Sequence, residues 1–186
     1  KELFVSRIAD YAKTIPAAEW ILSGTWDHTL WGGELPQASW IDAVTPNNPV
    51  LINRSDGHSA LANSLAMKMA GISAATKEVH GGTILRDSNG NPTGIFRDNA
   101  VDLFNKVVPI STAKVEDNAL EAAMNLYAKN GITSVHNMGT WAELAAFRRN
   151  YEAGKLTTRI YANVPLDTWA RLDAELTRKG SGDEDR

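Results

Sequence analysis

The amino-acid sequence predicts an α/β protein, and three observations support this fold class. In the C-terminal half, short apolar runs alternate with segments of helical periodicity, which is the rhythm of βαβ units with a parallel sheet. The N-terminal half mixes short strands, a β-hairpin signal and short helices. Hydrophobic residues make up 43% of the 186 residues, so the chain can bury a sizeable core.

The segment before Pro49 is expected to hold short elements joined by loops. Apolar residues at helical spacing predict a helix over residues 3–15, which ends at Pro16. A short strand is expected over residues 20–22, before a loop rich in glycine and tryptophan, GTWDHTLWGGELP. The proline at the end of this loop favours a further short helix, because proline is tolerated in a first helical turn.

The next segment combines an apolar strand with a polar turn. A buried strand is expected over residues 50–53, and a helix over residues 59–70 with Gly71 as its left-handed C-terminal cap. Asp56 and His58 then lie between the end of a strand and the start of a helix. Open α/β sheets place functional residues at such a position.

The rest of the chain gives clearer periodic signals. Two strands, 83–87 and 94–98, flank SNGNPT, which is typical of a hairpin turn. Thr140 and Glu143 have the spacing of a capping box at a helix start. The elements expected after the hairpin are helix 113–129, strand 132–138, helix 140–154, strand 158–164 and helix 167–177.

Composition excludes several classes of function. The net charge is −3 and the isoelectric point is about 5.8, so no basic surface for nucleic acid is expected. No apolar run reaches the length of a membrane span. The chain has no cysteine, which favours the cytoplasm, and export stays open because the sequence opens at Lys1 without an initiator methionine.

Asp56 and His58 are the first candidate site residues, and two interpretations stay open. They could form a proton-transferring or orienting pair at a pocket mouth, with a helix N-terminus nearby to favour an anion. Alternatively, Asp56 caps the predicted helix and His58 packs as a half-buried side chain.

Two further pairs are candidates for a substrate pocket. Trp26 and Asp27 suit the wall of a pocket for a small organic ligand, or they belong to a loop that buries its tryptophans on the core. His136 and Asn137 end a predicted strand, where barrel enzymes place catalytic groups, although a single histidine there is more often a satisfied polar group. The sequence has no His-x-His, no His-Glu-x-x-His and no cysteine pair, so no metal ligand is assigned.

Five ordered blocks between Glu19 and Val164 resemble a known family. The blocks are EWILSGTWDHTLWGGELP, IDAVTPNNPVLINRSDGHSALANSLAMKMAGI, GGTILRDSNGNPTGIFRDNA, NGITSVHNMG and GKLTTRIYANV. They are similar to the metal-dependent amidohydrolases of the third group, which include N-substituted formamide deformylase-like proteins. The resemblance implies a distorted TIM-type (β/α) barrel, of which this chain is a fragment with a mixed α+β insertion containing a β-hairpin.

The resemblance also implies a division of the chain. Residues 1–110 would be the α+β segment inserted between the first and second barrel strands. Residues 111–179 would be βα units of the barrel, with strands near 132–138 and 158–164. Residues 180–186 would form a polar tail.

The activity implied by the resemblance is metal-dependent hydrolysis of a C–N bond in a small amide, formamide or cyclic amide. The resemblance also implies a divalent metal in the longer protein, with zinc as the expected ion. The residues that bind this metal in the family match no residue here, so this chain alone is expected to hold no metal and to be inactive. Asp56, His58, Trp26 and Asp27 would line the substrate entrance of the longer protein. Incomplete burial of apolar faces makes self-association a risk.

Two alternatives to a hydrolase fragment stay open. One is a non-catalytic module that binds a small molecule with the tryptophan-rich loop. The other is a domain that serves only as a subunit interface.

Overall fold

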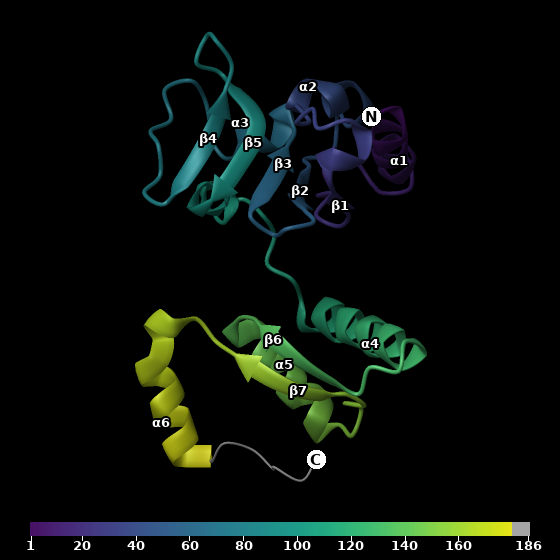
Figure 1. Cartoon of the computed structure of the whole chain (residues 1–186), viewed down its shortest axis with the longest axis vertical. Coiled ribbons are helices and arrows are strands. Elements are labelled where there is room, and N and C mark those ends of the chain that lie inside the picture. Colours follow the sequence, from purple (N-terminus) through teal and green to yellow (C-terminus); the bar gives the residue numbers. More distant parts are fainter. Residues whose placement is uncertain (180–186) are drawn as a thin grey trace. The chain divides into compact units, whose positions relative to one another are not determined.

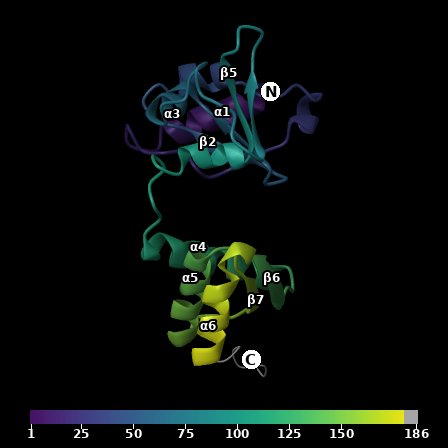
Figure 2. The same cartoon turned by 90° about the vertical axis from the view of Figure 1, so that its left-hand side faces the viewer.

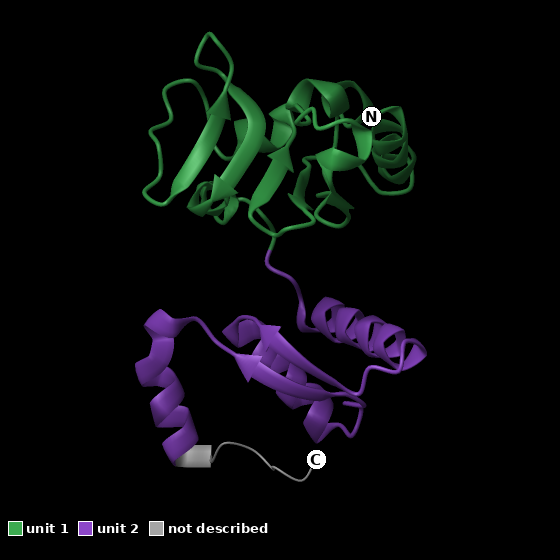
Figure 3. Cartoon of the chain, viewed as in Figure 1, with its two compact units in different colours: residues 1–109 green, residues 110–186 purple. Residues whose placement is uncertain are grey.

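The computed structural model describes residues 1–179 and divides the chain into two compact units. Unit 1 is Lys1–Pro109, and unit 2 begins at Ile110 (Figure 3). The interpretation of residues 1–110 as an insertion between barrel strands stays a prediction. The predicted polar tail, 180–186, lies outside the described residues.

Unit 1 is built on a five-stranded sheet with the order β1-β2-β3-β5-β4 (Figure 1). β1 runs parallel to β2, and the other neighbours are antiparallel. The predicted hairpin is confirmed, since β4 pairs with β5 across the turn. The strands are β1 (Thr25–Trp26), β2 (Leu51–Arg54), β3 (Ser59–Ala62), β4 (Gly82–Arg86) and β5 (Pro92–Asp98).

Short helices complete unit 1 and cover two apolar clusters. One cluster gathers around Ile41, Val50 and Ile52, and the other contains Phe96 and Phe104, whose rings meet edge to face at 4.8 Å. Together these clusters join the helices to the sheet. The α-helices are α1 (Glu2–Ala12), α2 (Ala38–Ile41) and α3 (Ser64–Met69), and the 3-10 helices are η1 (His28–Trp31), η2 (Asp42–Val44) and η3 (Asn99–Phe104).

The predicted helix over residues 59–70 is wrong in its first part. Ser59–Ala62 form β3, which is buried along its whole length between β2 and β5. A short apolar run that is buried on both faces cannot be distinguished from a helix by periodicity alone. Asp56 and His58 therefore lie in the turn of a β-hairpin, and the proposed helix N-terminus beside them does not exist.

The predicted strand over residues 20–22 is also wrong. The structure has only an isolated parallel bridge between Ile21 and Val50, and the strand begins at Thr25. The helix predicted over residues 3–15 is present but shorter, since α1 ends at Ala12 rather than at Pro16. Gly71 follows α3 with a φ of +70°, as a left-handed cap requires.

Asn63 joins four segments of unit 1 through a fully buried side chain. Its carboxamide oxygen accepts hydrogen bonds from the backbone N–H groups of Val50, at 3.0 Å, and Ala66, at 2.9 Å. Its amide nitrogen donates to the Thr45 hydroxyl and to the Asn48 carbonyl, both at 2.9 Å. The same residue is thus the N-cap of α3 and the tie between the start of β2 and the end of β3.

Unit 2 contains the predicted alternation of helices and strands. Helix 113–129 is confirmed with the expected ends, and the capping box at Thr140 and Glu143 is present. β6 and β7 pair in parallel with α5 between them in sequence, which makes a βαβ unit. The elements are α4 (Ala113–Lys129), β6 (Ser134–Met138), α5 (Trp141–Glu152), β7 (Arg159–Asn163), η4 (Leu166–Thr168) and α6 (Trp169–Lys179).

Helices α4 and α5 lie on one side of the β6–β7 pair (Figure 2). Val135 and Ile160 face the helices, where Leu120 and Ala146 are buried. The opposite face carries exposed side chains, including His136 and Tyr161. The strands of unit 1 do not extend this sheet. None of the helices in the described part of the chain is long and apolar enough to cross a lipid bilayer.

Replacing Asn63 by alanine is expected to destabilise unit 1 by about 3 kcal/mol, because buried N–H and C=O groups lose their partners. Urea unfolding followed by tryptophan fluorescence measures the loss. Asn53→Ala is the matched control, because Asn53 is an exposed position on β2. A change in Asn63→Ala no larger than in the control would show that the side chain does not hold the unit together.

Candidate functional site

A group of ionisable side chains gathers at one end of the sheet in unit 1, and we call it the charged edge. The C-terminal ends of β1, β2 and β5 and the β2–β3 turn meet there, because β1 is parallel to β2 and β5 is antiparallel to β3. The charged edge consists of Asp27, His28, Arg54, Asp56, His58 and Asp98.

Arg54 links two of the predicted pairs. Its Nη1 donates to Asp56 Oδ2 at 2.6 Å, and its Nη2 lies 4.0 Å from Asp27 Oδ1. This is possible because Trp26 and Arg54 are register partners in the parallel β1–β2 pair. The structure therefore brings Trp26 and Asp27 to the same end of the sheet as Asp56 and His58.

Trp26 belongs to the core of unit 1. Only 2% of its surface is exposed, and its indole N–H donates to the Ile52 carbonyl at 3.0 Å. The interpretation that the tryptophan-rich loop packs on the core is thus correct for Trp26. A role for Trp26 as part of a pocket wall stays a prediction.

Asp27 is held as an anion by the start of η1. Its Oδ1 accepts from the backbone N–H of Thr29 at 3.0 Å and from the Thr29 hydroxyl at 2.8 Å. The Thr29 backbone N–H is the largest cause of a lowered Asp27 pKa and the Thr29 hydroxyl is the second; burial opposes them, and the charges of Arg54 and His28 lower the pKa by smaller amounts. Asp27 is therefore charged at neutral pH.

His58 and Asp98 form an exposed pair across the hairpin. His58 Nδ1 lies 3.1 Å from Asp98 Oδ1, and the side chains are 77% and 53% exposed. The backbone holds both in place, because Asp98 N–H donates to the His58 carbonyl and Asp56 Oδ1 accepts from His58 N–H. A carboxylate partner at Nδ1 requires the proton there, so neutral His58 presents Nε2 as an acceptor to solvent or to a ligand.

Asp98 has an unusual backbone conformation. Its φ is 48° and its ψ is −129°, a region that L-residues rarely adopt. Strain of this kind clusters at ligand and active sites. The side chain of Asp98 thus meets His58 at a conformational cost.

The described residues do not form a metal site. No group of three or more histidine, cysteine, aspartate or glutamate side chains within residues 1–179 could hold a metal ion. Arg54 instead pairs with two of the three aspartates of the charged edge, Asp56 and Asp27, and Asp98 contacts His58. These residues therefore do not fit the divalent metal that the resemblance implies.

His136 and Asn137 in unit 2 differ in environment. His136 is exposed and stacks on Tyr161 of the neighbouring strand, with ring centroids 5.0 Å apart. Asn137 is half-buried, and its Oδ1 has no hydrogen-bond partner. Both residues line one cavity of about 390 Å³ beside α4 and α5, although adjacent strand residues point their side chains to opposite faces. Their roles in a pocket stay predictions.

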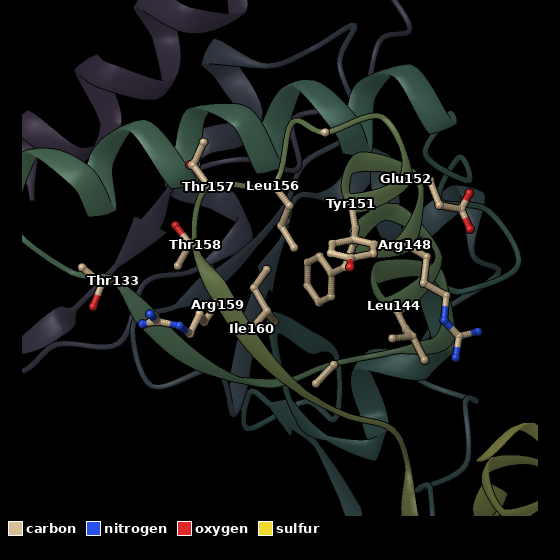
Figure 4. Close-up of a pocket in the computed structure, with 13 residues that line it drawn as sticks. Thr133, Leu144, Arg148, Tyr151, Glu152, Leu156, Thr157, Thr158, Arg159 and Ile160 are labelled. Carbon is tan, nitrogen blue, oxygen red and sulfur yellow. The ribbon is translucent and has the colours of Figure 1, made fainter. Parts of the chain in front are cut away.

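A large cavity in unit 2 is lined by none of the predicted site residues. It measures about 1210 Å³ and lies between α5 and β7 (Figure 4). Apolar side chains such as Leu144, Leu156 and Ile160 line it, and Arg148 at its edge is paired with Glu175. Hydroxyl and ionisable side chains, among them Thr158, Glu152 and Arg159, share the lining, so the cavity is mixed in character rather than apolar.

Sequence reasoning missed Arg54, Asp98 and Tyr161. Arg54 comes directly after the strand predicted over residues 50–53 and two positions before Asp56, which was a usable signal. Asp98 lies 40 residues from His58, and only the β3–β5 register brings them together. Tyr161 likewise meets His136 only through the parallel register of β6 and β7.

The strained backbone at Asp98 predicts that glycine is more stable than alanine at this position, the reverse of the order at most positions. Asp98→Gly should be more stable than Asp98→Ala by about 1–2 kcal/mol, because both lose the carboxylate and only glycine adopts this φ freely. Thermal unfolding of both variants measures the difference. At Asp102, which has no positive φ, the glycine variant should instead be less stable than the alanine variant. If the glycine and alanine variants had the same order of stability at Asp98 and at Asp102, the assignment of backbone strain to Asp98 would be wrong.

The lowered pKa of Asp27 predicts a specific pH dependence. Because the folded pKa lies below the ordinary value of 3.8, Asp27 stabilises unit 1 fully above that value, and this stabilisation is lost as pH falls through the folded pKa. The difference in unfolding free energy between wild type and Asp27→Asn should therefore be constant from pH 7 to about pH 5 and shrink below pH 3.8. A difference that grows toward acid pH would contradict the assignment.

Known proteins resemble this chain over most of its length. "Protein LONG AFTER FAR-RED 3" of Arabidopsis thaliana is 38% identical and is matched by 97% of this chain, over 33% of its own length. "N-substituted formamide deformylase" of Arthrobacter pascens is 33% identical, with 80% of this chain and 29% of that protein covered. "Putative amidohydrolase YtcJ" of Bacillus subtilis is 29% identical, over 93% of this chain and 35% of that protein.

Solved structures show a similar fold. A metal-dependent hydrolase of Pyrococcus horikoshii matches 94% of this chain with a TM-score of 0.60 and 20% identity, over 33% of its own length. A second, from Pyrococcus furiosus, matches with a TM-score of 0.57. The chain spans about a third of the length of these proteins. Because residues 4–185 also match the family model described as "Amidohydrolase family", the chain belongs to the amidohydrolase family.

Proposed function

We propose that this chain is part of a metal-dependent hydrolase that cleaves a C–N bond in a small amide, formamide or cyclic amide. Membership of the amidohydrolase family supports the reaction class. The relative named N-substituted formamide deformylase supports formamides as the first substrate class to test. The observation within this chain that carries the proposal is the exposed His58–Asp98 pair, which is held by a strained backbone at the charged edge.

Unit 2 supports a place in a (β/α) barrel. In such barrels helices cover one face of the sheet and the other face forms the interior. β6 and β7 run parallel, and helices α4 and α5 lie on one side of them (Figure 2). The His136–Tyr161 stack lies on the other face. We assign β6 and β7 to the second and third barrel strands, with unit 1 as an insertion before them.

The charged edge would then contribute to the substrate entrance. His58 Nε2 can accept a hydrogen bond from a substrate N–H, or pass a proton to the leaving nitrogen when the ring is protonated. Asp98 holds the ring orientation through Nδ1, and Arg54 fixes the turn through Asp56. Asp27 adds a negative charge at neutral pH.

The divalent metal of the family has no ligand set among the described residues. We therefore propose that zinc, or another divalent ion, is held by parts of the whole protein outside residues 1–179. The isolated chain should then neither hydrolyse amides nor bind zinc tightly.

The proposal is tested with the natural full-length protein that contains this chain. It should hydrolyse members of a panel of N-substituted formamides, amides and cyclic amides, and dialysis against a chelator should abolish the activity. His58→Gln should lower kcat/KM about 100-fold, as expected for a lost proton-transfer group. His80→Gln is the matched control, because His80 is an exposed loop histidine of the same unit.

Two results would overturn the proposal. One is a full-length protein that binds metal but hydrolyses no member of the panel. The other is elemental analysis that finds one zinc per molecule in the purified 186-residue chain, since the ligands would then lie within it.

A further inference from the structure

We propose that a cavity between α1 and the β1 edge of unit 1 binds a small aromatic carboxylate. This site adjoins the charged edge but does not depend on the hydrolase assignment, because binding can be measured in the chain alone. α1 lies beside the β1 edge of the sheet (Figure 1).

The cavity has the size and lining of a ligand pocket. Its volume is about 560 Å³, and small-molecule pockets measure roughly 300–1,000 Å³. The lining comes from α1, from the segment 21–31 that contains β1, and from Ile52 of β2. The aromatic rings that reach its surface come from Phe4, Tyr11 and Trp31, whereas Trp26 is only 2% exposed and lies beneath the cavity as part of the core.

α1 presents two rows of side chains to the cavity. Phe4 and Ile8 pack against the core cluster, so they form the floor. Leu3, Arg7 and Tyr11 follow one another at intervals of four residues and are exposed, so they form the rim. The rim thus places one cation and one phenol side by side above an apolar floor.

The tryptophan rings offer apolar surface rather than hydrogen bonds. Trp26 N–H donates to the Ile52 carbonyl, and Trp31 N–H donates to the Glu34 carbonyl at 2.8 Å. Trp31 also packs on Phe4 with ring centroids 5.2 Å apart. With both indole donors in use, this part of the cavity favours an aromatic or aliphatic group.

The charges of the cavity favour an anionic group at the rim. Lys1 is paired with Glu34 at 3.1 Å and lies over the Trp40 ring, and Asp27 is bound to Thr29. Within residues 1–179, the Arg7 guanidinium and the Tyr11 hydroxyl have no hydrogen-bond or ion-pair partner. A carboxylate can accept two parallel hydrogen bonds from the guanidinium and a third from the neighbouring phenol.

Asp27 orients such a ligand. It is an anion on the β1 side of the same cavity, so it repels a carboxylate from that wall and leaves the α1 rim as the favoured place for it. The aromatic part of the ligand then lies toward the floor formed by Phe4 and Trp31. The predicted ligand class is therefore a monocarboxylate with one aromatic ring and a short linker.

The experiment compares 3-phenylpropanoate with its uncharged analogue 3-phenylpropan-1-ol, by calorimetry and tryptophan fluorescence on the 186-residue chain. Wild type should bind the carboxylate at least 10-fold more tightly than the alcohol, as a charge-assisted contact requires. Arg7→Gln should remove this preference and leave alcohol binding unchanged. Tyr11→Phe should weaken carboxylate binding by a smaller factor.

Arg97→Gln is the matched control, because Arg97 is an exposed arginine of β5 that does not line the cavity. It should bind both probes as wild type does. Three results would each overturn the proposal. Wild type could bind both probes equally, or carboxylate binding could survive Arg7→Gln. The third is that neither probe saturates the chain at a probe concentration of about 10 mM. Circular dichroism confirms that each variant is folded.

Discussion

The buried carboxamide of Asn63 is the constraint on which unit 1 depends. It satisfies backbone groups at the start of β2 and at the start of α3, and it donates to the loop that follows η2. Buried polar groups are costly unless every one of them is paired, so this arrangement admits one register of β2 against β3. That register places the β2–β3 turn, and with it Asp56 and His58, at the same end of the sheet as the end of β5. The charged edge is therefore a consequence of a polar interaction inside the core.

The sequence predicted unit 2 better than unit 1 for a physical reason. Helix 113–129 and the capping box at Thr140 depend on local periodicity and on contacts between residues three or four apart. Ser59–Ala62 depends on burial by two neighbouring strands, which is a non-local property. A run such as Ser-Ala-Leu-Ala carries no preference strong enough to reveal that burial, so it was interpreted as the beginning of a helix.

The candidate site also combines features that depend on local sequence with features that depend on non-local strand pairing. Asp56 and His58 were chosen as candidates from their place after an apolar run, which needs no tertiary information, and their role in a site stays a prediction. Asp98, the partner of His58, could not be found in this way, because the contact exists only through strand pairing. The positive φ of Asp98 could not be predicted from the sequence either, because the residue is an aspartate at a position where the backbone favours glycine.

Asp27 connects the two proposed functions of unit 1. On one side it faces Arg54 and the charged edge, and on the other it lines the aromatic cavity beside α1. Because Thr29 keeps it ionised, its charge acts on both sites at once. The carboxylate attracts cationic or N–H groups to the charged edge and excludes anions from the inner wall of the cavity. A ligand held at Arg7 would therefore place its uncharged end, rather than its carboxylate, toward β1 and the charged edge beyond it.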